Sequence, residues 1–188
     1  MSGPGHNGGP TLEPGAGWRR YAWRRARADL LPVLPLEVVR LRVARARDLG
    51  IDYRAYASVR AATGRDVIAL LFSENALRIG PGTPLLPAAE AARLAAVSGA
   101  ERQVAVYLPR DPEAVLAANP GLLDAAGRAP TLADGWSATR ARLAAFTAQR
   151  GLPSDAVLVV GATTLEAGWA AAGRMAGYLP AERYFAAL

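Results

Sequence analysis

Three short, mostly apolar runs predict β-strands in this chain. Residues 67–72 are six consecutive apolar residues bounded by Gly64 and Ser73, and residues 103–108 and 156–160 form two further strand-like runs. Apolar runs of this length between turn residues are typical of strands buried on both faces. Each run is followed by a turn-rich loop and a helical stretch, so the pattern predicts the alternating strands and helices of a parallel sheet.

Helices are predicted between and after these strands. They cover, in chain order, residues 85–97, 112–118, 137–150 and 164–178. Ser137 is a good N-terminal cap and Gly151 a good terminator for the third helix, and Pro180 is expected to open a last short helix. Trp136 and Trp169 lie beside or within helices and are expected to be packing residues. The expected fold class is therefore α/β, with a small, mostly parallel sheet of three or more strands flanked by helices.

A helical hairpin is predicted in front of the first strand. Residues 36–49 form an amphipathic pattern, and the apolar residues expected on its inner face are Leu36, Val39, Val43 and Ala46. Gly50 suits the C-terminal cap of this helix, and Asp52 suits the N-terminal cap of a second helix that runs to Thr63. The basic N-terminal part of the chain is thus expected to be helical and to pack on, or be appended to, the sheet.

A hairpin in a basic region also suggests a helix-turn-helix, in which the next element would be the recognition helix. Residues 67–72 are apolar on every side, whereas a helix that lies in a DNA groove must present polar side chains to base edges. A buried strand is therefore preferred for residues 67–72, and the helix-turn-helix remains the alternative.

The composition of the 188 residues is globular, with 52% hydrophobic and 20% charged residues. No apolar run approaches the roughly 20 residues that cross a bilayer, so no transmembrane segment is expected. Residues 1–17 are rich in Gly and Pro and resemble neither a secretory signal nor a transit peptide. We therefore expect a cytoplasmic protein with a flexible leader at 1–17, a basic helical segment at 18–63 and an α/β module at 64–188, the last two forming one compact domain.

Two absences restrict the chemistry. All 22 basic residues are arginine, so neither a Schiff-base lysine nor a P-loop lysine exists. The single histidine, His6, lies in the leader, which argues against Ser-His-Asp or Cys-His catalysis and against a histidine zinc site. We expect no metal and no cofactor, and whether the chain is an enzyme stays open. A GC-rich genome would also explain arginine in place of lysine.

The net positive charge is concentrated at the front of the chain. Residues 1–60 hold 11 arginines against 5 acids, and residues 17–30 alone hold five arginines against one acid. The candidate residues for binding nucleic acid or another anion are Arg19, Arg20, Trp23, Arg24, Arg25 and Arg27. Interleaved Arg and aromatic side chains suit stacking on bases and neutralisation of phosphates. They also suit a helix that folds back on its own domain, with its arginine stems covering apolar surface.

Polar residues follow each predicted strand, where ligands bind in open parallel sheets. The candidate ligand-site residues are Ser73, Glu74, Asn75, Arg110, Asp111, Gly161, Thr163, Thr164 and Glu166. After the last strand, backbone N–H groups and hydroxyls at a helix start suit an anion, and Arg110 would add a bidentate contact. The alternative is purely structural, because Ser and Thr cap helices and Glu favours helix N-termini.

Three functions follow from these observations. The first is a nucleic-acid-associated or other anion-binding protein that uses the Arg/aromatic segment. The second is a small α/β module that binds a phosphate or carboxylate ligand, with or without catalysis that uses no His, Cys or Lys. The third is a non-catalytic subunit that docks on an acidic protein surface. The sequence leaves the oligomeric state open.

Overall fold

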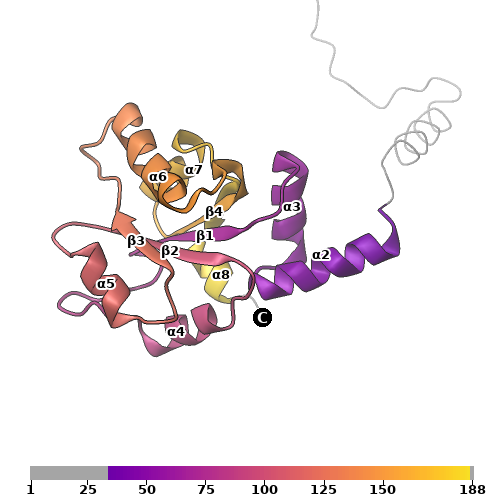
Figure 1. Ribbon diagram of the computed structural model, residues 1–188, viewed down its shortest axis with the longest axis horizontal. Coiled ribbons are helices and arrows are strands. Elements are labelled where there is room, and N and C mark those ends of the chain that lie inside the picture. Colours follow the sequence, from indigo (N-terminus) through magenta and orange to yellow (C-terminus); the bar gives the residue numbers. More distant parts are fainter. Residues whose placement is uncertain (1–33, 187–188) are drawn as a thin grey trace, which may run out of the picture. The chain divides into compact units, whose positions relative to one another are not determined.

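The computed structural model describes residues 34–186, which contain a five-stranded, all-parallel sheet in the order β3-β2-β1-β4-β5 (Figure 1). The strands are β1 (Ala69–Ser73), β2 (Glu101–Val106), β3 (Ala125–Arg128), β4 (Val157–Gly161) and β5 (Gly177–Pro180). The register of the central strands pairs Phe72 of β1 with Val104 of β2 on one side and with Val160 of β4 on the other. The expected α/β fold with a parallel sheet flanked by helices is confirmed.

Helices cover both faces of this sheet. The helices in the described part are α2 (Leu36–Asp48), α3 (Tyr53–Thr63), α4 (Ala88–Ala95), α5 (Pro112–Ala118), α6 (Trp136–Arg150), α7 (Thr164–Ala172) and α8 (Ala181–Ala186), with a 3-10 turn at Ser154–Ala156. Buried residues of α6 and α7 pack with Leu71 on one face, whereas buried residues of α3, α4, α5 and α8 pack with Leu70 and Phe72 on the other. The result is a three-layer arrangement with two apolar cores.

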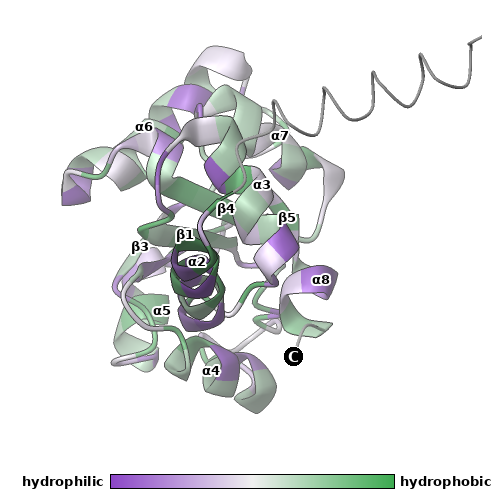
Figure 2. Cartoon of the chain, turned by 90° about the vertical axis from the view of Figure 1, so that its right-hand side faces the viewer, coloured by the Kyte–Doolittle hydropathy of each residue, from purple (hydrophilic) through white to green (hydrophobic). Residues whose placement is uncertain are grey.

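The central strands form because every one of their side chains is removed from water. All residues of β1 and of β4 are buried, and Figure 2 shows this part of the sheet in the green of hydrophobic residues. Because successive side chains point to opposite faces, Leu70 and Leu71 enter different cores. An uninterrupted apolar run therefore suits a strand with helices on both sides.

The three predicted strands are confirmed with small shifts at their ends, but β3 and β5 were not predicted. The predicted helix 164–178 is too long, because α7 ends at Ala172 and the chain then turns through Gly173 and Arg174, whose φ is 52°. Tyr178 consequently lies in β5 rather than in a helix. The expected N-terminal cap Ser137 is wrong by two positions, since Gly135 occupies the cap of α6.

The helical hairpin is present, and the caps of its second helix, α3, are those expected. Asp52 accepts a hydrogen bond from the backbone N–H of Ala55, and Gly64 ends α3 in the left-handed conformation with a φ of 71°. On α2, Ala46 is buried, but Leu36 and Val43 are exposed, so the predicted inner face of this helix is only partly correct. The helix-turn-helix alternative is wrong, because its third element is strand β1.

Several predictions concern residues outside the described range. The leader at 1–17 and the Arg/aromatic segment fall there, and that segment contains Arg19, Arg20, Trp23, Arg24, Arg25 and Arg27. Their structure and their proposed contacts stay predictions. Within residues 34–186, no helix combines the length and the apolar character that crossing a membrane requires.

Candidate ligand-binding site

The strand order creates a switch point beside β1. The chain runs from β1 through β2 to β3 on one side, and then returns to place β4 and β5 on the other side of β1. At such a point the connections that follow neighbouring strands diverge to opposite faces of the sheet, and the crevice beyond the carboxyl ends is where ligands bind in open α/β sheets. The topology therefore directs attention to the residues that follow β1, β2 and β4.

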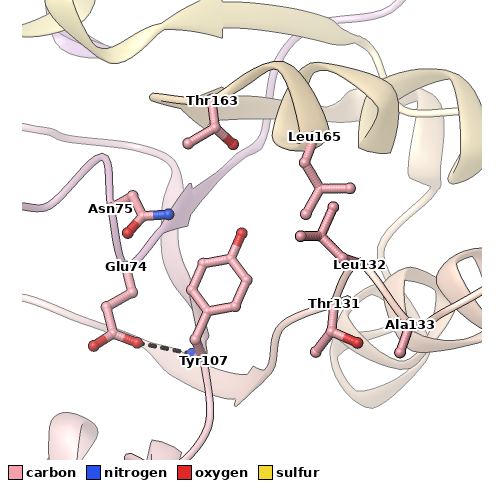
Figure 3. A pocket seen from close by; sticks show the side chains of 8 residues that line it. All are labelled: Glu74, Asn75, Tyr107, Thr131, Leu132, Ala133, Thr163 and Leu165. Atoms are coloured by element: carbon pink, nitrogen blue, oxygen red, sulfur yellow. Dashed lines mark hydrogen bonds between the residues drawn. The ribbon is translucent and has the colours of Figure 1, made fainter.

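A pocket of about 640 Å³ lies at this place, within the size range of small-molecule sites. Its lining residues lie in the segments that follow four strands (Figure 3), and they are Glu74, Asn75, Tyr107, Thr131, Leu132, Ala133, Thr163 and Leu165. The loop after β3 contributes Leu132, whose side chain is 88% exposed. Apolar and uncharged polar groups make up most of the wall.

A buried carboxylate, that of Glu166, connects the strand ends behind this wall. Its Oε2 accepts hydrogen bonds from the backbone N–H groups of Ala162 at 2.6 Å and Thr163 at 2.9 Å. Its Oε1 accepts from the Asn75 amide at 2.8 Å and from the Tyr107 hydroxyl at 2.9 Å. With a side chain that is 0% exposed, Glu166 ties together the segments after β1, β2 and β4.

The local sequence places Glu166 there through a capping box. Thr163 is the N-terminal cap of α7, and its hydroxyl accepts from the Glu166 N–H at 3.3 Å while the Glu166 side chain accepts from the Thr163 N–H. This reciprocal pair satisfies two N–H groups that a helix start leaves without partners. The structural role expected for Glu166 at a helix start is thus present, and the same carboxylate extends beyond the cap to the segments that follow β1 and β2.

Gly161 makes room for this arrangement. A Cβ atom at Gly161 would lie 2.8 Å from the Cβ of Glu166 and 2.8 Å from a ring carbon of Tyr178. The Tyr178 hydroxyl donates to the Gly161 carbonyl oxygen at 2.9 Å. Any larger residue at the end of β4 would therefore displace either the carboxylate or the tyrosine.

The two tyrosines beside Glu166 are held in their neutral form. Burial raises the pKa of Tyr107 far above its ordinary value, and the nearby negative charge of Glu166 raises this pKa further. Burial and the charge of Glu166 also raise the pKa of Tyr178. Tyr107 therefore serves as a permanent hydrogen-bond donor to Glu166 and is unsuited to act as a base near neutral pH.

A second polar cluster, around Glu74 and Arg110, lies beside the pocket. Glu74 accepts from Arg110 Nε at 2.5 Å and from the Tyr107 backbone N–H at 2.7 Å, and Figure 3 shows its carboxylate directed at the Tyr107 backbone, away from Thr163 and Leu165. The other guanidinium nitrogens of Arg110 donate to the carbonyl oxygens of Thr83 and Gly80. Arg110 thus holds the loop before α4 against the end of β2.

The structure brings only some of the predicted ligand-site residues together. Asn75, Glu74 and Thr163 line the pocket, while Glu166 and Gly161 lie directly behind its wall. The remaining predicted residues take structural positions. Ser73 is buried and accepts from the Ala76 N–H, Asp111 caps α5, Thr164 is the exposed first residue of α7, and Arg110 is engaged as described.

Five lining residues were not predicted from the sequence: Tyr107, Thr131, Leu132, Ala133 and Leu165. Tyr107 was assigned to the interior of a strand, whereas β2 ends one residue earlier. The loop at 131–133 was missed because β3 was missed. Of the two tryptophans expected to pack, Trp169 is 1% exposed and confirms the prediction, whereas Trp136 is 63% exposed and contradicts it.

Among the described residues, no group of three or more His, Cys, Asp or Glu side chains is arranged to hold a metal ion. Comparisons of the chain with protein families, with curated proteins and with solved structures found no match. The geometry of the pocket and the charge distribution of the sequence are therefore the basis for a functional proposal.

Proposed function

We propose that the chain is a small-molecule-binding module whose ligand occupies the pocket at the switch point. The observation that carries this proposal is the coincidence of a pocket of about 640 Å³ with the carboxyl ends of β1, β2 and β4. Topology and cavity are independent arguments for the same place. The wall is also well supported, because the hydrogen bonds of Glu166 fix three of its segments relative to one another.

The same geometry favours binding without chemistry. A reaction centre needs a nucleophile or an acid-base group that is free to act on the ligand. In the described part of the chain, the carboxylates beside the pocket are engaged by donors of the chain itself, and the Ser73 hydroxyl is buried in a turn. The Tyr107 hydroxyl is bound to Glu166. The proposed role is therefore to hold a ligand.

The test is a ligand screen on a matched pair of variants. Ala133→Phe places a ring in the pocket, whereas Ala138→Phe adds the same ring to an exposed position of α6 that does not line it. Small-molecule fragments are screened by amide chemical-shift perturbation on the wild type. We expect hits that shift the amides of 74–75, 107, 131–133 and 163–165, and that Ala133→Phe alone abolishes. Hits that bind all three proteins alike, or no hits at all, would contradict the proposal.

A second candidate function rests on the charge of the front segment. Residues 17–30 carry a net charge of +4 of the total +6, which favours an anionic partner, with nucleic acid as the first choice. Neutralising about three to five phosphates makes affinity fall steeply with salt. Replacing Arg20, Arg24 and Arg27 together with Gln should weaken oligonucleotide binding for all sequences and flatten this salt dependence.

The control for the second function is the wild type at low salt. If it binds neither single- nor double-stranded oligonucleotides, the nucleic-acid proposal fails, and docking on an acidic protein surface takes its place. This experiment is independent of the pocket, so the two proposals stand or fall separately.

A further inference from the structure

The donors behind the pocket wall already hold a negative group. A carboxylate offers about four lone-pair sites, and four donors from Ala162, Thr163, Asn75 and Tyr107 converge on Glu166. All four donors are uncharged, so these partners leave the negative charge of the carboxylate uncancelled. Because Asn75, Tyr107 and Thr163 also line the pocket, this charge lies directly behind the surface that a ligand meets.

Two of these donors are backbone N–H groups of the kind that an anionic ligand would use. Backbone N–H groups at a helix start are the usual receptors for a phosphate or carboxylate group, and at α7 the N–H groups of Ala162 and Thr163 both point at Glu166 instead. The nearby cation Arg110 is similarly occupied, by Glu74 and by the carbonyl oxygens of Gly80 and Thr83. An anion entering the pocket would find these donors taken and a like charge behind them.

Much of the remaining surface of the pocket is apolar. Figure 3 shows the ring of Tyr107 and the side chains of Leu132 and Leu165 pointing into the same space. Such a wall gains free energy from burying apolar ligand surface, and it offers few hydrogen-bonding groups for a strongly hydrated ligand.

We propose that Glu166 sets the ligand class of the pocket: it excludes molecules that bear a phosphate or carboxylate, and the pocket admits uncharged molecules with an apolar body. The carboxylate of Glu166 takes the place that an anionic group of a ligand would otherwise occupy. This inference rests on the proposed binding function and names the chemistry of its ligand.

The first experiment removes the carboxylate of Glu166 from its four hydrogen-bond donors and supplies a small anion in solution. Glu166→Ala leaves four donors facing an empty space beside the pocket, and its control Glu113→Ala removes an exposed carboxylate from the first turn of α5. Thermal melts are compared in acetate, in phosphate and in chloride at equal ionic strength. We expect acetate or phosphate to raise the melting temperature of Glu166→Ala by about 3 °C over chloride, through preferential binding to the folded state. The wild type and the control should not respond.

The second experiment keeps the site filled and removes only the charge. In Glu166→Gln the new amide can accept from the two backbone N–H groups and donate to the Tyr107 and Asn75 oxygens, so the fold is retained even if Glu166→Ala does not fold. Matched pairs of an aromatic amide and the corresponding carboxylate are titrated against both proteins. We expect the wild type to prefer the amide, and Glu166→Gln to reduce this preference at least about tenfold.

The results separate the inference from the function on which it rests. An unchanged amide preference in Glu166→Gln, or no anion-specific response in a folded Glu166→Ala, overturns the role of Glu166 whether or not ligands bind. If no compound of either class binds the wild type, the proposed binding function fails, and the ligand class named here fails with it. An anion-specific response of Glu166→Ala would then still show that the carboxylate occupies an anion receptor.

Discussion

Arg110→Ala should be among the most destabilising substitutions outside the apolar cores. The guanidinium donates to Glu74 and to two loop carbonyl oxygens, and it is the charged partner of a carboxylate that is itself only 11% exposed. Truncation would remove the ion-pair partner of Glu74 and leave its hydrogen bond from the Tyr107 N–H. It would also leave the carbonyl oxygens of Gly80 and Thr83 without their donor.

The magnitude follows from the burial of the pair. Removing one partner of a buried ion pair costs about 3–5 kcal/mol, because the other charge remains without compensation. For a chain of this size each kcal/mol lowers the melting temperature by roughly 2–4 °C, so we expect a decrease of roughly 6–20 °C. Replacing both Glu74 and Arg110 with Ala should destabilise the protein by less than the sum of the two single substitutions, because no charge is then left unpaired.

The assay is urea unfolding followed by circular dichroism, with an exposed ion pair as the control. Arg65 lies 2.8 Å from Asp155, but both side chains are largely in solvent, at 58% and 45% exposure. Arg65→Ala should therefore change the free energy of unfolding by only about 0–1 kcal/mol. If Arg110→Ala proves as mild as this control, the assignment of Arg110 as the anchor of the loop before α4 is refuted.

Three further predictions concern the site and its surroundings. Gly161→Ala should destabilise the protein by about 1–3 kcal/mol, because the new Cβ would meet two side chains at 2.8 Å. Gly168→Ala, in an open position within α7, should instead stabilise the protein by about 0.5–1 kcal/mol. Chemical denaturation shows whether the free energy of unfolding falls in the first variant and rises in the second. Tyr107→Phe removes one donor from a buried carboxylate and should cost about 1.5–3 kcal/mol, and a wild-type unfolding curve would refute this. Hydrogen bonds from Arg150 lower the pKa of Glu101, although partial burial opposes this effect. The stabilisation of the folded state by these hydrogen bonds is therefore fully present above the ordinary Glu pKa of about 4.3. It is lost as the pH falls through the lower pKa that Glu101 has in the folded state. The difference in melting temperature between wild type and Arg150→Gln should accordingly shrink as the pH falls from about 6 to about 3.

The central part of the sheet was predictable because its physical requirement is visible along the chain. A strand buried on both faces must be apolar at nearly every position, and β1 (up to its last residue, Ser73) and β4 meet this requirement within single short runs. The edge strands do not. β3 is Ala125–Arg128 and β5 is Gly177–Pro180. Each of these four-residue strands contains a glycine, and neither has a β-branched side chain. Their strand conformation comes from pairing with β2 and β4, which no local pattern encodes.

The candidate site divides in the same way. Asn75 and Thr163 were predicted because polar residues directly after predicted strands are expected at the carboxyl edge of a parallel sheet. The connection of Asn75 to Glu166, which lie far apart in the sequence, depends on β1 and β4 being neighbours. Strand order is a property of the whole fold, so the sequence could supply the separate groups but not their convergence on one carboxylate.

The central strand also governs when this protein can complete its fold. β1 takes its partners from both directions along the chain, and Ala69 pairs with Glu101 on one side and with the much later Val157 on the other. Contacts between distant segments form slowly because closing a long loop costs chain entropy. During synthesis, residues of β1 through β3 leave the ribosome well before β4, and throughout that interval one side of a mostly apolar strand presents open N–H and C=O groups. The time that separates β1 from β4 is therefore the period in which a nascent chain is most exposed to pairing with a neighbour, and a slow ribosome over residues 107–156 would lengthen it.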